Sequence, residues 1–138
     1  MLHFIFIALG GALGALSRYI IDYSVTNYFH SDFPFGTLTV NLIGCFIIGM
    51  MYRLIFHEVI HIKFSPYIIT GFLGALTTFS SYAYSTLMLF EKGNYILGWL
   101  NLLANNVLGI LFVFLGVELT NKTMKKYFSH KIKKDEVL

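Results

Sequence analysis

The sequence predicts an all-α integral membrane protein that crosses the bilayer four times. Of its 138 residues 57% are hydrophobic and only 12% are charged, and the mean hydropathy is +0.70. This composition leaves too little polar surface to cover a water-soluble globule. The charged residues also divide the chain into four stretches, at 2–21, 33–52, 64–90 and 93–117, and Arg18 is the only charge inside them. Because about 20 helical residues span the hydrocarbon core, each stretch is long enough to cross once.

The first stretch has a secretory signal peptide as its alternative reading. Its start carries no Lys or Arg and it has no small-residue cleavage pattern, so we expect a retained helix. Its small residues, among them Gly10, Gly11 and Gly14, recur about four apart and favour close helix packing. Arg18 lies about one turn from the end of the stretch. It either extends to the membrane interface or forms an electropositive vestibule that concentrates anions.

Polar amides recur on one face of the second and of the fourth stretch. In the second, Thr37, Asn41 and Gly44 share a face, and the Asn41 amide is costly in lipid unless it meets protein or water. It serves either as a packing hydrogen bond or as part of a polar path. In the fourth, Asn101 and Asn105 are four residues apart, with Asn106 beside them, on what we expect to be a buried polar track.

The third stretch contains the run GFLGALTTFSSY at residues 71–82. Glycines and hydroxyl pairs disfavour a regular helix, so the run predicts a break at membrane depth, with a simple kink at Gly74 as the alternative. Backbone groups freed by a break must be satisfied by protein, ion or water. Just beyond it Phe79 and Tyr82 flank Ser80 and Ser81. Ring edges beside hydroxyl donors can face an anion, and the phenolic hydroxyl of Tyr82 adds an optional donor.

The charges outside the apolar stretches are balanced across the membrane. Arg53 and Lys63 fall on the side of the termini, and Arg18 and Lys92 fall on the other. With two positive charges on each side, the positive-inside rule favours neither orientation. A chain that inserts in both orientations would show this balance. The basic tail at 120–138 instead favours a cytoplasmic C-terminus, and we expect it to be a solvated extension of the four-helix transmembrane domain at 1–119.

Several other functions are weaker interpretations. Residues 57–61 read HEVIH, a metalloprotease pattern, but no further acidic ligand follows at a suitable spacing and the run lies in a short loop. Cys45 reads as a small apolar filler. A four-spanning multidrug or cation transporter needs a membrane-embedded carboxylate for proton coupling, and no Asp or Glu occurs inside the four stretches. A scaffold subunit without transport is the third alternative. We therefore expect no enzyme.

Three motifs together resemble the Fluc (CrcB) fluoride channel family. They are GGALGALSRY at 10–19, GTLTVNLIG at 36–44 and the run at 71–82. The resemblance covers all four stretches and implies passive, fluoride-specific efflux by an antiparallel, dual-topology homodimer in the bacterial cytoplasmic membrane, with fluoride and the lipid bilayer as partners and no nucleic acid. A bundle this small has no room for its own lumen, which fits a pathway between subunits.

The resemblance also implies roles for individual residues. Backbone carbonyls of Gly74 and Thr77 would hold a structural sodium ion that is not transported, and Arg18 would lie near the aqueous mouth. The expected ion pathway comprises Asn41, Phe79, Ser80, Ser81, Tyr82, Asn101 and Asn105. Family members commonly carry Phe where this chain has Tyr82, and Tyr or a hydroxyl residue where it has Asn101 and Asn105.

Overall fold

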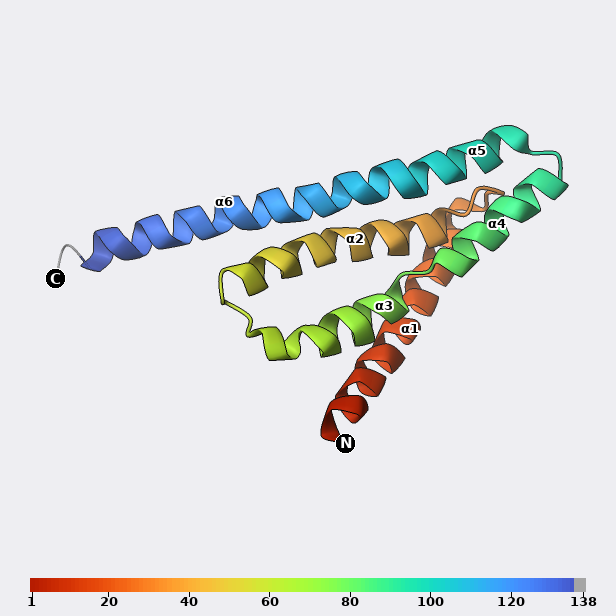
Figure 1. The fold of residues 1–138 in the computed structure, drawn as a ribbon. Coiled ribbons are helices and arrows are strands. Elements are labelled where there is room, and N and C mark those ends of the chain that lie inside the picture. Colours follow the sequence, from red (N-terminus) through yellow and green to blue (C-terminus); the bar gives the residue numbers. More distant parts are fainter. Residues whose placement is uncertain (136–138) are drawn as a thin grey trace.

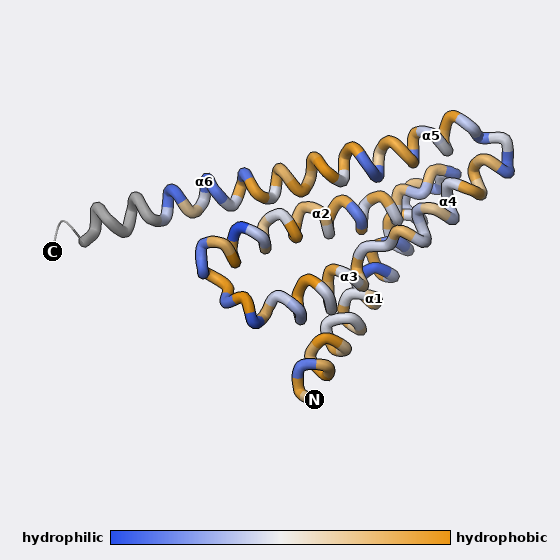
Figure 2. Tube along the Cα trace, viewed as in Figure 1, coloured by the Kyte–Doolittle hydropathy of each residue, from blue (hydrophilic) through white to orange (hydrophobic). Residues whose placement is uncertain are grey.

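The chain folds as a bundle of helices, drawn in Figure 1. The computed structural model describes the backbone of residues 1–135 and the side chains of residues 1–127; the predicted tail residues 136–138 lie outside them. No strand occurs in the described part, so the all-α prediction is confirmed. Three helical segments there are long and apolar enough to cross a membrane, at Leu2–Phe29, Phe35–Phe56 and Tyr95–Tyr127. Figure 2 shows hydrophobic residues along most of each helix, with hydrophilic ones at the turns and at a few positions inside the helices.

Helix α1 (Leu2–Phe29) is longer than predicted. The sequence predicts that the first crossing ends at residue 21, where the charge of Asp22 interrupts the apolar stretch, and that a loop follows at 22–32. In the structure the helix continues for two more turns and ends where His30 adopts the left-handed conformation, with φ of 45°. Asp22 stays inside the helix because its carboxylate accepts a hydrogen bond from Thr37 Oγ1, at 3.3 Å, near the start of the next helix. An acidic group there also complements the positive end of the helix dipole.

Helices α2 (Phe35–Phe56) and α6 (Gly109–Asp135) lie side by side and run parallel (Figure 1). A β-carbon at Gly49 would overlap the carbonyl of Val113, and one at Gly116 would overlap the carbonyl of Phe46. The two backbones therefore approach as closely as glycine allows, which is how helices associate in lipid.

The third crossing is not one helix. It consists of a π-helical segment η2 (Pro66–Leu73), the single turn α3 (Gly74–Leu76) and helix α4 (Phe79–Glu91). Between them Thr77 and Thr78 are extended, with ψ of 156° and 116°. The predicted break is confirmed, and it is narrower than the run of 71–82 suggested. Gly74 itself is helical, so the break is centred on the two threonines.

The fourth crossing is helical from end to end. It comprises α5 (Tyr95–Leu103), a π-helical turn η3 (Ala104–Leu108) and α6. The sequence predicted that the apolar stretch ends at 117 and gives way to a solvated extension. The described part of that extension is helical and continues α6 to Asp135. This rod is about 60 Å long, twice the hydrocarbon thickness, so its basic end lies beyond the apolar part of the bundle.

The connections place the start of α1 beside the turn between the second and third crossings. His3 Nδ1 on α1 is hydrogen-bonded to the hydroxyl of Tyr67, close to the 3₁₀ turn η1 (Ile62–Phe64) that leads into the third crossing. At the opposite end Lys92 Nζ lies 3.8 Å from Asp32 Oδ1, so the turn after α1 and the turn after α4 are adjacent. This is the up-and-down arrangement that four crossings require.

The contact between α1 and the third crossing gives a first testable prediction. A β-carbon at Gly14 would overlap the carbonyl of Phe72, whereas one at Gly11 would have its nearest neighbour at 3.9 Å. We expect Gly14→Ala to separate the two segments and lower stability by about 1–3 kcal/mol. Gly11→Ala, the matched control, should change stability by no more than about 0.5 kcal/mol. Thermal unfolding of the purified variants in detergent measures both, and equal stabilities would contradict the close packing at Gly14.

Candidate functional site

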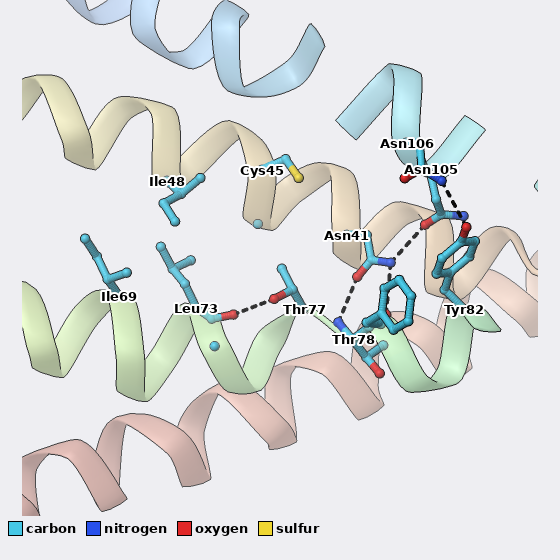
Figure 3. Close-up of a pocket in the computed structure, with 13 residues that line it drawn as sticks. Asn41, Cys45, Ile48, Ile69, Leu73, Thr77, Thr78, Tyr82, Asn105 and Asn106 are labelled. Atoms are coloured by element: carbon cyan, nitrogen blue, oxygen red, sulfur yellow. Dashed lines mark hydrogen bonds between the residues drawn. The ribbon is translucent and has the colours of Figure 1, made fainter. Parts of the chain in front are cut away.

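A cavity of about 470 Å³ lies beside the break in the third crossing. It is bounded by α2, by both sides of the break and by the π-helical turn η3 (Figure 3). Its wall is mixed, with an apolar end and a polar end that carries amides and hydroxyls. The lining residues are Asn41, Gly44, Cys45, Ile48, Ile69, Leu73, Gly74, Thr77, Thr78, Phe79, Tyr82, Asn105 and Asn106.

Asn41 holds the broken backbone. Its Oδ1 accepts a hydrogen bond from the Thr78 amide at 2.8 Å, and its Nδ2 donates to the Thr78 carbonyl at 3.2 Å. Both backbone groups of one unwound residue are therefore satisfied by a single side chain from α2 (Figure 3). Unpaired backbone groups at membrane depth cost several kcal/mol, and this pair of hydrogen bonds offsets that cost at Thr78.

The Asn41 amide also begins a ladder of hydrogen bonds that crosses the bundle. Its second N–H donates to Asn105 Oδ1 at 2.9 Å, and Asn105 Nδ2 donates to Asn101 Oδ1 at 2.9 Å. Asn101, which is 0% exposed, then donates to Thr86 Oγ1 at 2.8 Å. The predicted polar track on the fourth crossing is thus a connected chain of amides. It joins α2 to α4 through the fourth crossing.

Two consecutive asparagines stabilise the π-helical turn η3. Asn105 Nδ2 donates to the Asn101 carbonyl at 3.1 Å, and Asn106 Nδ2 donates to the Leu102 carbonyl at 2.8 Å. Both bonds return to a carbonyl four residues earlier, where a widened turn weakens the regular backbone bond. Because consecutive helical residues point about 100° apart, Asn105 faces α2 while Asn106 reaches Tyr82 on α4.

Thr78 caps the helix that follows the break. Its Oγ1 accepts the Ser81 amide at 3.1 Å, and its hydroxyl donates to Ser81 Oγ at 3.0 Å. The Ser80 hydroxyl lies 3.3 Å from the same oxygen. An N-cap threonine of this kind satisfies one of the free amides that begin a helix. The two serines are exposed at the first turn of α4 and do not line the cavity.

The structure brings most of the expected pathway residues to one place. Asn41, Phe79, Tyr82 and Asn105 line the cavity, as do Gly74 and Thr77 from the expected sodium site. The rings of Phe79 and Tyr82 meet edge to face, with centroids 5.3 Å apart and planes at 75°. The residues Ser80, Ser81, Asn101 and Arg18 lie outside the cavity wall.

Two predicted metal sites remain to be compared with the structure, the metalloprotease pattern at 57–61 and the sodium site at the break. Among the described residues no group of three His, Cys, Asp or Glu side chains is placed to bind a metal, and His61 Nδ1 instead accepts the backbone amide of Lys63 at 3.2 Å. The metalloprotease pattern at 57–61 therefore has no support.

At the break, the Thr77 carbonyl is outside any helix and accepts no hydrogen bond from the described residues. A free carbonyl at membrane depth suits a hard monovalent cation.

Comparison of the sequence with known proteins identifies the family of this chain. Residues 5–117 match the family described as "CrcB-like protein, Camphor Resistance (CrcB)". The chain belongs to the CrcB family. The matched region begins in α1 and ends within α6, so it contains the whole cavity wall and leaves out the basic end of the last helix.

Relatives of this CrcB chain carry a common name. A protein from Dehalococcoides mccartyi named "Fluoride-specific ion channel FluC" is 45% identical over 114 residues, which are 82% of this chain and 88% of that protein. Proteins of the same name from Shewanella woodyi and from a Nitratiruptor species are 41% and 43% identical, over 86% and 84% of this chain and 96% and 90% of theirs. The relatives thus align over more than four fifths of this chain.

The sequence of this CrcB chain places Thr78 and Asn106 beside other polar residues without giving them a role, and it does not single out Thr86. Thr78 is the clamped and capping residue, Thr86 ends the ladder, and Asn106 bonds Tyr82 at 2.9 Å. Thr86 stands one helical turn after Tyr82, a spacing that could have indicated a shared face. The bond between Asn106 and Tyr82 joins two crossings, and no local spacing signals it.

The two hydrogen bonds from Asn41 to the backbone of Thr78 predict a large loss of stability when Asn41 is replaced by an apolar side chain of similar size. Asn41→Leu leaves the Thr78 amide and carbonyl without partners, which should lower stability by roughly 2–4 kcal/mol. Asn105→Leu is the matched control, because it removes a rung of the ladder without touching the broken backbone. We expect it to cost less. Thermal unfolding in detergent ranks the two variants, and a larger loss for Asn105→Leu would mean that Asn41 is not the principal support of the break.

Proposed function

We propose that this protein is a fluoride-specific ion channel that lets fluoride leave the cell passively. The observation that carries the proposal is the match to proteins named fluoride-specific channels over more than four fifths of the chain. The ring edge of Phe79 and the hydroxyl of Tyr82 in the cavity wall support it. Fluoride is small and strongly hydrated, so a pathway must replace its water with close hydrogen donors.

Passive movement fits the chemistry of the cavity wall. The lining residues include no carboxylate, imidazole or amine that could couple transport to protons. This argues against the multidrug or cation transporter. Hydrogen fluoride enters through lipid as a neutral acid and ionises inside. An inside-negative potential then drives the anion out, with about 2.3 kcal/mol per charge for each 100 mV.

We place the ion pathway along Asn41, Phe79, Tyr82 and Asn105, with Ser80, Ser81 and Asn101 as further members and Arg18 near the mouth. The amide hydrogens of the three asparagines are engaged within the chain, as the ladder shows. Their part is therefore to hold the wall in place. The ring edge of Phe79 then becomes the principal contact for the anion, because the rim of an aromatic ring is its positive part.

The working unit in this proposal is an antiparallel homodimer in the bacterial cytoplasmic membrane. In the isolated chain Phe79 is 77% exposed and Gly74 is exposed as well, although both belong to the cavity wall. A second copy would cover them. The balance of Arg53 and Lys63 against Arg18 and Lys92 supports insertion in both orientations.

A sodium ion is the second element of the proposal. The carbonyls of Gly74 and Thr77 would hold it at the break, where it would supply positive charge to free carbonyl oxygens and tie two copies together. The support is the free carbonyl of Thr77 described above, together with the exposed surface at Gly74.

Liposomes that contain only this protein test the channel. A fluoride gradient should collapse rapidly, as a fluoride electrode records. Phe79→Ile keeps the bulk of the side chain and deletes the ring edge, so it should slow the flux about tenfold or more, or at least about 1.4 kcal/mol in barrier. Phe114→Ile, at an exposed position on α6, is the matched control. Proton-coupled cation exchange would identify the transporter instead, and no flux of any kind would identify a scaffold.

Dual topology has its own measurement. A cysteine at position 32, in a Cys45→Ser background, lies in the turn between α1 and α2. In intact cells a membrane-impermeant thiol reagent should label about half of the molecules, and a permeant reagent should label the rest. Labelling of all molecules from one side would rule out insertion in both orientations.

The sodium proposal predicts dependence on the cation present during purification. Replacing sodium throughout by a large organic cation should weaken the dimer, because free carbonyls at the break would lose their counter-charge. Size-exclusion chromatography measures the dimer fraction, and added sodium should restore it. An unchanged dimer without sodium would remove the site.

A further inference from the structure

We propose that Asn106 is a positioning residue that turns the hydroxyl hydrogen of Tyr82 toward the cavity, where it serves as a donor to the permeating anion. The inference rests on the proposed function and adds a specificity-determining pair to it. The pair spans two crossings, with Tyr82 on α4 and Asn106 in the π-helical turn η3. Both residues line the cavity (Figure 3).

The orientation of the Asn106 amide follows from its second partner. Asn106 Nδ2 lies 2.8 Å from the carbonyl oxygen of Leu102, and a carbonyl can only accept. The nitrogen, and not the oxygen, must therefore face that side. The same nitrogen lies 2.9 Å from the Tyr82 hydroxyl, so its other hydrogen is donated to the phenolic oxygen. Tyr82 is the acceptor in this bond and keeps its own hydrogen.

The hydrogen of Tyr82 is then free to be donated. No second partner of the hydroxyl occurs among the described residues, and the ring is otherwise buried at 6% exposure. A buried hydroxyl without an acceptor loses the free energy of one hydrogen bond. The cavity is the space that both residues share, and an anion there would supply the missing acceptor.

The other hydroxyl and amide groups of the cavity wall already donate their hydrogens to acceptors within the chain. The Thr77 hydroxyl donates to the Leu73 carbonyl at 3.0 Å, and the Thr78 hydroxyl donates to Ser81. The amides of Asn41 and Asn105 donate along the ladder and to backbone carbonyls. Among the hydroxyl and amide groups that line the cavity, Tyr82 therefore holds the uncommitted donor.

This hydroxyl stands next to the aromatic contact already proposed. Phe79 meets Tyr82 edge to face, so the ring edge and the O–H group belong to one aromatic pair. A short O–H donor favours a small anion of high charge density over a larger halide, because the bond to fluoride is shorter and stronger. Asn106 would thus act on the selectivity between fluoride and chloride as well as on the rate.

A double-mutant cycle in liposomes tests the proposal, with fluoride and chloride fluxes measured by ion-selective electrodes. Tyr82→Phe and Asn106→Leu should each slow fluoride flux by about three- to tenfold and lower the fluoride-to-chloride flux ratio. The double variant should be no slower than the slower single variant, because the effect of Asn106 on flux is exerted through the Tyr82 hydroxyl. Asn121→Leu, the same change far along α6, is the matched control and should leave both quantities unchanged.

Each outcome has a distinct meaning. If the unmodified protein carries no fluoride, the proposed function fails and this inference fails with it. If it conducts, but the two single effects multiply in the double variant, Asn106 does not act through Tyr82 and the inference alone is overturned. Normal flux and selectivity in Asn106→Leu overturn it too. Should that variant fail to assemble as the parent does on size-exclusion chromatography, Asn106→Ala makes the same comparison without added bulk.

Discussion

The structure depends on one constraint, which is that a helix broken in lipid must find partners for its freed backbone groups. The break at Thr77 and Thr78 meets it with a side chain from another crossing, because Asn41 bonds both the amide and the carbonyl of Thr78. These two hydrogen bonds hold α2 against the third crossing. The cavity lies along this junction, so its shape follows from how the break is satisfied.

The amide ladder extends the same support to the rest of the bundle. From Asn41 it runs through Asn105 and Asn101 to Thr86, with each donor matched to an acceptor inside the protein. Amides suit this use because each carries two donors and an acceptor without a charge to be desolvated. A fully satisfied network defines one arrangement of the crossings, whereas apolar packing alone tolerates small shifts.

The sequence was informative where the signal is local. The apolar stretches, the glycine contacts of α1 and the break at the paired threonines could all be predicted from composition and spacing. The end of α1 could not, because Asp22 is kept helical by Thr37 of the next helix. Nor could the partners of the asparagines be predicted. Spacing placed Asn101 and Asn105 on one face, but which donor meets which acceptor depends on how the crossings pack.

The neutrality of the cavity wall has a consequence for a cell in acid surroundings. Hydrogen fluoride enters fastest there, so the demand on the proposed exit is greatest when protons are most abundant. The side chains that line the cavity include no carboxylate, imidazole or amine, and the network that holds them is built from amides and hydroxyls. Mild acidification gives these groups no proton to take up. The wall of the proposed exit thus contains no side chain that becomes charged when its surroundings are mildly acidified.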